Sequence, residues 1–286
     1  MFNKCFGIFV FSVLFQTALF AEKPERLFFS VDKKTQTEEK HFSIRSGISS
    51  EKLGSVSEKL ETLYYAWTEL FLDKNKPVEN TKHKIIIFRS KAEYVRSLRQ
   101  IEPNIAQSNG YYSPQTLTAY FYFNNENFDR TLLHEVTHQL FSEVYSDEKF
   151  PRGINFWLVE GTALFMETLK TKTNQCSLGD IMDDWLYAAK EYRYKKNFRL
   201  PVSQLVTMTA KDIQHDENIR KIYAQSAALV HWMMFAENGK YRPALQKMLR
   251  QVYDETTQDN SLSRLTGLPF DEIDKKYDDF LKTVPD

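Results

Sequence analysis

Two histidines four residues apart, with a glutamate after the first, give this chain its clearest chemical pattern: His134, Glu135 and His138, a His-Glu-x-x-His motif. On an α-helix, residues four apart lie on one face about one turn along the axis, so both imidazoles would point toward one position. Imidazole suits zinc, which in catalytic sites takes three protein ligands and leaves the fourth position to water. Glu135 would stand where it can take a proton from that water. We therefore expect a zinc site on this helix.

A third ligand must come from elsewhere in the chain, and Glu160 is the best candidate. It follows His138 after 21 intervening residues, in an apolar segment (155–167) that is expected to form a second helix. Its small neighbours Gly161 and Ala163 would allow the two helices to approach closely. Glu167, in the same segment, is a weaker candidate and is expected to be an exposed helix charge.

The two motifs together resemble those of the gluzincin group of zinc metallopeptidases. The second motif is Trp-Leu-Val-Glu-Gly-Thr-Ala at residues 157–163, and in gluzincins a helix at this place supplies a glutamate ligand. The metzincin pattern does not fit, since Phe141 and Val144 stand where it needs glycine and histidine. The gluzincin resemblance covers most of residues 41–240.

The resemblance implies one zinc ion held by His134, His138 and Glu160. It implies that Glu135 acts as the base toward the attacking water and then as the proton donor to the leaving amine. Gluzincins often carry an acidic residue one turn after the ligand glutamate, but this chain has Leu164 there. The sequence therefore names no group that would orient the histidines.

An oxyanion in the transition state needs a donor besides the metal. In several gluzincins a tyrosine or histidine of the C-terminal lobe supplies it, and Tyr223 is the candidate here, with His231 as the alternative. A histidine in an apolar helix is more often a core residue. Three others, His41, His83 and His215, lie among polar residues and are expected at the surface.

The order of the expected elements and the resemblance together predict an α+β, zincin-like fold in two lobes. Residues 22–145 would form an N-terminal α/β lobe with a small mixed sheet and the catalytic helix. Residues 146–286 would form an all-helical C-terminal lobe that carries the third metal ligand.

Within this plan, alternating or continuous apolar runs predict strands at residues 41–45, 84–88 and 117–123. The Asn-Gly and Ser-Pro pairs at 109–114 predict a turn, and 178–196 is expected to be one helix. In gluzincin-like domains a sheet edge beside the catalytic helix binds extended peptide. By that analogy, residues 117–123 are the candidate edge, with an ordinary core strand as the alternative.

The first 21 residues are expected to be a secretory signal, since a lysine at position 4 precedes an apolar run and Ala21 offers a small residue for cleavage. The chain is therefore expected to be secreted or periplasmic, and to insert in a membrane only if this leader stays attached. Of the two cysteines, Cys5 lies in the leader, and Cys176 is expected to be structural or incidental.

The 38 basic and 38 acidic side chains cancel, so a nucleic-acid partner is not indicated. The function expected from the two motifs is zinc-dependent hydrolysis of peptide bonds, with a peptide or protein as substrate. Two alternatives stay open. One is a peptidase-fold binding protein without turnover, and the other is a zinc amide hydrolase that acts on cell-wall material.

Overall fold

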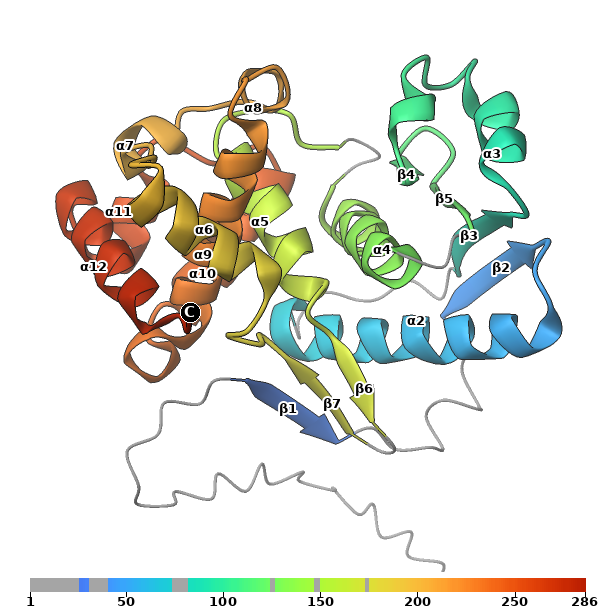
Figure 1. Cartoon of the computed structure of the whole chain (residues 1–286), viewed down its shortest axis with the longest axis horizontal. Helices are drawn as coiled ribbons and strands as arrows, with labels where there is room; N and C mark the ends of the chain where they lie inside the picture. Colours follow the sequence, from blue (N-terminus) through green and yellow to red (C-terminus); the bar gives the residue numbers. More distant parts are fainter. Residues whose placement is uncertain (1–25, 31–40, 74–81, 124–126, 147–149, 173–174) are drawn as a thin grey trace, which may run out of the picture.

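The computed structural model describes residues 26–30, 41–73, 82–123, 127–146, 150–172 and 175–286 (Figure 1). Helices and strands both contribute to these ranges, so the fold is α+β, as expected. The predicted leader at residues 1–21 lies outside the described part of the chain. Among the helices that are described, none is both long enough and apolar enough to cross a membrane.

One sheet has four strands in the order β2-β3-β5-β4. β2, β3 and β5 are mutually parallel, and β4 is antiparallel to β5. The bounds of these strands are β2 (Phe42–Ser46), β3 (His83–Phe88), β4 (Gly110–Ser113) and β5 (Thr118–Tyr122).

The edge beside the cleft is therefore β4. The strand predicted at 117–123 exists as β5, and it lies between β3 and β4, so the alternative of an ordinary core strand is confirmed and the edge assignment is wrong. The turn predicted at 109–114 is also wrong in part. Residues 110–113 were expected to be part of a turn. Their two tyrosines favour extended backbone, and they pair with β5. The reversal of the chain comes after them, where Leu117 takes a left-handed φ of 47°.

Both faces of the four-stranded sheet are covered by packed side chains. Its central strands suit this position because they are apolar at almost every residue. Ile85 and Ile87 of β3 point into the main core, while Ile86 and Phe88 pack in a second cluster. That cluster lies on the side of α3 (Lys91–Leu98), since Tyr94 and Leu98 belong to it. Successive side chains of a strand point to opposite faces, so a continuous apolar run fits a sheet covered on both sides.

Two long helices cover the main-core face of this sheet: α2 (Ser50–Phe71) and α4 (Phe128–Tyr145). Figure 1 shows α2 running beneath the sheet and α4, and it extends toward the C-terminal half. Buried apolar residues of α4, among them Leu132, Val136 and Leu140, fix this helix in the core. The motif helix is therefore held firmly, which a precise site requires.

The C-terminal half is built around the packed pair α5 (Phe156–Met166) and α9 (Ile219–Gly239). Every side chain of α5 is buried. The remaining helices surround this pair, with the short helix η1 lying in the N-terminal half: η1 (Ile105–Gln107), α6 (Asp184–Lys195), α7 (Val202–Leu205), α8 (Ala210–Gln214), α10 (Arg242–Tyr253), α11 (Ser261–Thr266) and α12 (Phe270–Thr283).

The C-terminal half is not all-helical, which corrects the prediction. A second, antiparallel sheet has the order β1-β7-β6, formed by β1 (Leu27–Ser30), β7 (Gln175–Leu178) and β6 (Lys170–Lys172). The helix predicted from residue 178 begins only at Asp184. β7 forms because it pairs with β1, about 150 positions earlier in the chain, and a pairing that distant leaves no local signal.

Candidate metal centre

The motif helix α4 brings His134 and His138 together as its spacing predicts. Their Nε2 atoms face each other at 3.1 Å, and their rings meet edge to face with centroids 4.7 Å apart. His138 is buried and also meets the ring of Phe150 edge to face. The two imidazoles therefore converge on one position at the floor of a cleft.

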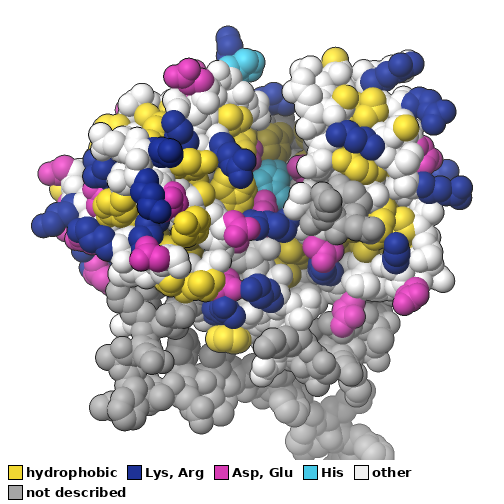
Figure 2. Space-filling model, viewed as in Figure 1, with side chains coloured by type: hydrophobic (Ala, Val, Ile, Leu, Met, Phe, Trp, Pro, Cys, Tyr) yellow, Lys and Arg dark blue, Asp and Glu magenta, His cyan; other side chains and the backbone are white. Residues whose placement is uncertain are grey.

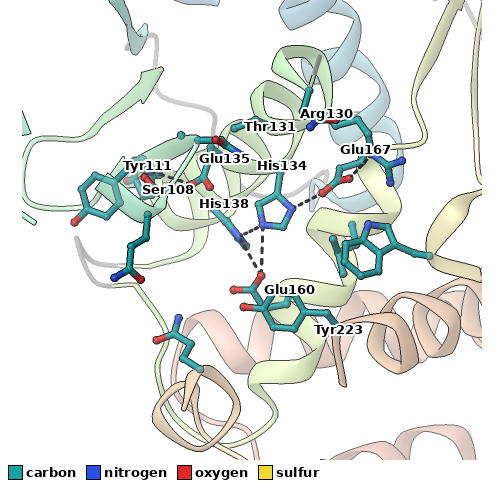
Figure 3. Close-up of a pocket in the computed structure, with 18 of the residues that line it drawn as sticks. Ser108, Tyr111, Arg130, Thr131, His134, Glu135, His138, Glu160, Glu167 and Tyr223 are labelled. Atoms are coloured by element: carbon teal, nitrogen blue, oxygen red, sulfur yellow. Dashed lines mark hydrogen bonds and ion pairs between the residues drawn. The ribbon is translucent and has the colours of Figure 1, made fainter. Parts of the chain in front are cut away.

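α5 carries Glu160 to the same position. Its Oε2 lies 3.4 Å from Nε2 of His134 and 3.9 Å from Nε2 of His138 (Figure 3). Glu160 is only 6% exposed, so its carboxylate is committed to this cluster. The close packing of α5 on α9 depends on Gly161, where a Cβ would lie 2.6 Å from the carbonyl oxygen of Ser226.

These three side chains have the spacing of metal ligands. One donor atom from each lies within 4.8 Å of the others, and the measured separations bracket the roughly 3.3 Å between ligands of a tetrahedral ion with bonds near 2.0–2.1 Å. Without a metal, the two Nε2 atoms can share one proton in a hydrogen bond, and a metal ion at this position would replace that proton. The donor set therefore fits a divalent metal ion that prefers nitrogen and oxygen ligands.

Glu167 orients the first of the two histidines. Its Oε1 accepts a hydrogen bond from Nδ1 of His134 at 2.8 Å, and its Oε2 accepts one from Nε of Arg130 at 2.8 Å. The prediction that Glu167 is an exposed charge is wrong, since its side chain is 9% exposed. A carboxylate on the far nitrogen fixes the tautomer that leaves Nε2 free for a metal.

Arg130 ties this arrangement to a third helix. Besides Glu167, its guanidinium reaches Asp183 at 3.4 Å and Asp184 at 3.2 Å. Asp183 is the N-cap of α6, where its side chain accepts a hydrogen bond from the backbone N–H of Trp185. One arginine thus connects the carboxylate that orients His134 to the start of α6.

The charges in the cluster differ strongly between the two histidines. Burial opposes a positive charge on His134, but hydrogen bonds to Glu160 and Glu167 outweigh it and hold the pKa of this imidazole well above its ordinary value. Burial lowers the pKa of His138 to about 3. Without a bound metal, His134 therefore carries the positive charge that balances the carboxylates, and His138 is neutral.

Glu135 lies on the side of α4 that faces β4. Its Oε2 accepts a hydrogen bond from the backbone N–H of Tyr112 at 3.0 Å, which fixes the carboxylate beside the candidate metal ligands. Burial raises the pKa of Glu135 above the usual glutamate value, although the neighbouring His134 lowers it in part. A carboxylate with a raised pKa is better suited both to take up a proton and to deliver one.

Tyr223 reaches the cluster, and His231 does not. Tyr223, on α9, hydrogen-bonds to Glu160 and lines the cleft (Figure 3). Burial and the charge of Glu160 raise the pKa of this phenol, so the hydroxyl keeps its proton and can donate it in a hydrogen bond. His231 is buried among the rings of Phe235 and Phe280, away from the cleft, with Nε2 at 3.3 Å from the carbonyl oxygen of Gly179.

Of the three histidines expected at the surface, His215 is exposed as predicted, whereas the prediction for His83 is wrong. His83 is not at the surface, since it is 6% exposed on β3 and hydrogen-bonds to Glu143 of α4. His41 is partly exposed and stacks on Tyr64. Neither lines the cleft.

The cluster opens into a cleft of about 850 Å³ between β4 on one side and helices of the C-terminal half on the other. Figure 2 shows the hollow between the two halves, with a histidine side chain visible in it. The wall near α5 and α6 includes Leu164, Trp185 and Ala188, while β4 and the segment before it supply Ser108, Asn109 and Tyr111. The cleft is large enough for several residues of an extended peptide.

Comparisons with known proteins add no family assignment. No family model matches the chain, and a search of curated proteins finds no significant relative.

All five residues predicted for the site, His134, Glu135, His138, Glu160 and Tyr223, line this one cleft. Sequence reasoning missed Arg130, the Tyr112 amide and the orienting role of Glu167. Glu167 had a usable signal, because it follows Glu160 by seven residues, about two helical turns, and so lies on the same face. Arg130 and the Tyr112 amide had none, since their roles depend on how α4 meets α6 and β4.

Proposed function

We propose that the protein is a zinc-dependent metallopeptidase of gluzincin type with a zincin-like fold, which hydrolyses peptide bonds after export from the cell. The observation that carries the proposal is the convergence of His134, His138 and Glu160 on one position, with Glu135 beside it. The export step rests on the predicted leader alone.

His134, His138 and Glu160 would hold the zinc ion, and Glu167 would keep His134 in the tautomer that the ion needs. When bound, zinc lowers the pKa of a coordinated water and polarises the carbonyl group of the substrate. The remaining chemistry belongs to side chains of this protein.

Glu135 accepts a proton from the attacking water and then delivers it to the nitrogen of the leaving amine. Its raised pKa suits both steps, since one carboxyl group must gain and lose a proton near neutral pH. Tyr223 keeps its proton and donates a hydrogen bond to the oxygen that gains negative charge in the transition state. The hydrogen bond from the Tyr112 amide holds Glu135 on the correct side of the reacting atoms.

Glu135→Gln tests this proposal because it keeps the shape of the site and removes the base. The parent and the variant, both loaded with zinc, are incubated with a diverse peptide library, and products are identified by mass spectrometry. We expect the parent to cleave peptides and the variant to lose activity by about a thousandfold or more while it keeps its zinc. Glu51→Gln, an exposed change on α2, is the matched control and should act like the parent.

A Glu135→Gln protein as active as the parent would refute the mechanism. A zinc-loaded parent that cleaves no peptide would contradict the peptidase proposal, and would leave a binding protein or a hydrolase of cell-wall amides to be tested next.

A further inference from the structure

Two arginines line the cleft without a partner among the described residues. Arg152 precedes α5 and Arg220 lies in the first turn of α9, and both are exposed. No hydrogen bond or ion pair of either guanidinium occurs within the described ranges. The third arginine of the cleft, Arg130, differs because three carboxylates bind it.

The two arginines reach the cleft from different segments of the C-terminal half. The backbone carbonyl of Arg152 accepts a hydrogen bond from the Ala210 amide, which fixes its loop against the start of α8. Its charge also reaches Tyr111 of β4, where it partly offsets the rise that burial causes in the pKa of that phenol. Arg220 precedes Tyr223 by three residues, so the two lie on the same face of α9.

The carboxylates of the cleft are already engaged elsewhere. Glu135 accepts a hydrogen bond from β4, Glu160 and Glu167 contact the histidines, and Asp184 pairs with Arg130. The other polar side chains of the described lining are uncharged, namely Gln107, Ser108, Asn109, Thr131, Asn127 and Gln214 together with the tyrosines. In the described part of the cleft, the guanidinium groups of Arg152 and Arg220 have no partner, whereas each carboxylate contacts a described residue, although the side chain of Asp184 is 92% exposed.

We propose that Arg152 and Arg220 recognise carboxylate groups of the substrate and direct the enzyme to acidic peptides. A guanidinium binds carboxylate with two parallel hydrogen bonds, which a lysine or an amide cannot match. The carboxylate has two sources, the side chain of an aspartate or glutamate near the scissile bond and the free C-terminus of a peptide. This inference rests on the proposed peptidase function and specifies its substrate class.

The test uses peptides that share one neutral core sequence found to be cleaved. One carries a glutamate beside the scissile bond and an amidated C-terminus, one is neutral with a free C-terminus, one is neutral and amidated, and one carries a lysine. The readout is the ratio of kcat/KM for each charged peptide to that for the neutral amidated peptide. The glutamate and free-carboxylate peptides separate the two sources.

We expect the parent to favour at least one carboxylate-bearing peptide by about tenfold at low salt, and the ratio to fall as salt rises. Arg152→Gln and Arg220→Gln should each lower the ratio about threefold to fivefold, as expected for partly exposed ion pairs. The double reversal, with Arg152→Glu and Arg220→Glu, should favour the lysine peptide. Arg264→Gln, an exposed change on α11, is the control and should leave every ratio unchanged.

Equal rates for all four peptides with the parent, or ratios that the double reversal does not change, would overturn the proposal. A second measurement separates failure of this inference from failure of the proposed peptidase function. It follows binding of the same peptides, carrying a fluorescent label, to the zinc-loaded Glu135→Gln protein, and binding needs no turnover. Fluorescence anisotropy should there show tighter binding of a carboxylate-bearing peptide, weakened by the double reversal. Equal binding of all peptides would contradict carboxylate recognition independently of catalysis.

Discussion

Glu167, which was expected to be an exposed charge, contacts one of the two motif histidines in the structure. Its carboxylate joins His134 to Arg130, so it fixes the imidazole from behind. Such a partner raises the basicity of the ligand and restricts its rotation. Glu167 therefore belongs with the three candidate ligands as part of the proposed metal centre, although it does not touch the metal position.

Glu167→Gln should weaken zinc binding by about tenfold to a hundredfold, because the neutral amide orients His134 less firmly and leaves Arg130 without its closest charge. Competition with a chromophoric zinc chelator measures the change. Glu51→Gln is the control for the loss of one negative charge and should bind zinc like the parent. Affinity equal to the parent's in Glu167→Gln would contradict the orienting role.

Zinc binding should release about one proton at neutral pH. The pKa of His134 is held above its ordinary value in the metal-free protein, so a proton must leave before zinc can bind there. His138, with its pKa lowered to about 3, contributes none. As pH falls below the raised pKa of His134, affinity should drop about tenfold per pH unit.

Titration calorimetry in two buffers of different ionisation enthalpy measures this release directly. Zinc binding heats that are equal in both buffers at pH 7 would contradict a protonated His134.

The candidate ligand set could be predicted from sequence because its convergence depends on helical spacing and one short motif. The i, i+4 pair on α4 needs only an intact helix, and Glu160 needs only a second helix close to the first. The orienting network was not predictable in the same way. Arg130 reaches Asp183 and Asp184 more than fifty residues away, and no local pattern reports such a contact.

At the scale of elements, the site depends on how closely α5 approaches α9. Glu160 comes from the first of these helices and Tyr223 from the second. Gly161 lies at their contact, where even one added carbon would meet backbone rather than a movable side chain. Small changes there should therefore affect stability and the site together.

Gly161→Ala should destabilise the protein by about 1–3 kcal/mol, since the added methyl group forces the two helices apart. Thermal unfolding should show a fall in Tm of about 2–4 °C for each kcal/mol in a chain of this size. Gly54→Ala is the matched control, because that position on α2 is open, and alanine there should raise stability by up to about 1 kcal/mol. Equal Tm values for the two variants would contradict the close approach.

The elements that sequence analysis placed correctly are those with strong local patterns. The motif helix α4 and the apolar strands β3 and β5 belong to this group. The errors fall on two short strands, one with turn-forming residues and one with a distant partner. β4 contains turn-like residues but pairs with β5, and β7 pairs with β1.

At the scale of the whole molecule, the main core is continuous from α2 through α4 and α5 to α12. The two halves therefore do not have separate hydrophobic cores. The second sheet also joins the two halves, because β1, at the start of the described chain, pairs with β7 of the C-terminal half. We expect one cooperative unfolding transition that includes this sheet.

Cys176 of β7 is a natural probe of that cooperativity. It is 1% exposed, and burial raises its pKa to about 11. In a Cys5→Ser chain, where Cys176 is the single thiol, labelling at pH 8 should be more than about a hundredfold slower in the native protein than in the unfolded one. As the denaturant concentration rises, the labelling rate of Cys176 should increase over the same range in which tryptophan fluorescence reports unfolding. Rapid labelling well below that transition would show that the β1-β7-β6 sheet opens by itself.

The most direct test of the account is the zinc content and zinc affinity of the purified chain beside Glu160→Ala, which removes the ligand supplied by the second helix. We predict about one zinc per parent chain by elemental analysis after dialysis. In Glu160→Ala we predict an affinity at least about a hundredfold weaker, while circular dichroism stays that of a folded protein. A parent without stoichiometric zinc, or a folded Glu160→Ala protein that binds zinc as tightly as the parent, would contradict the proposed metal centre.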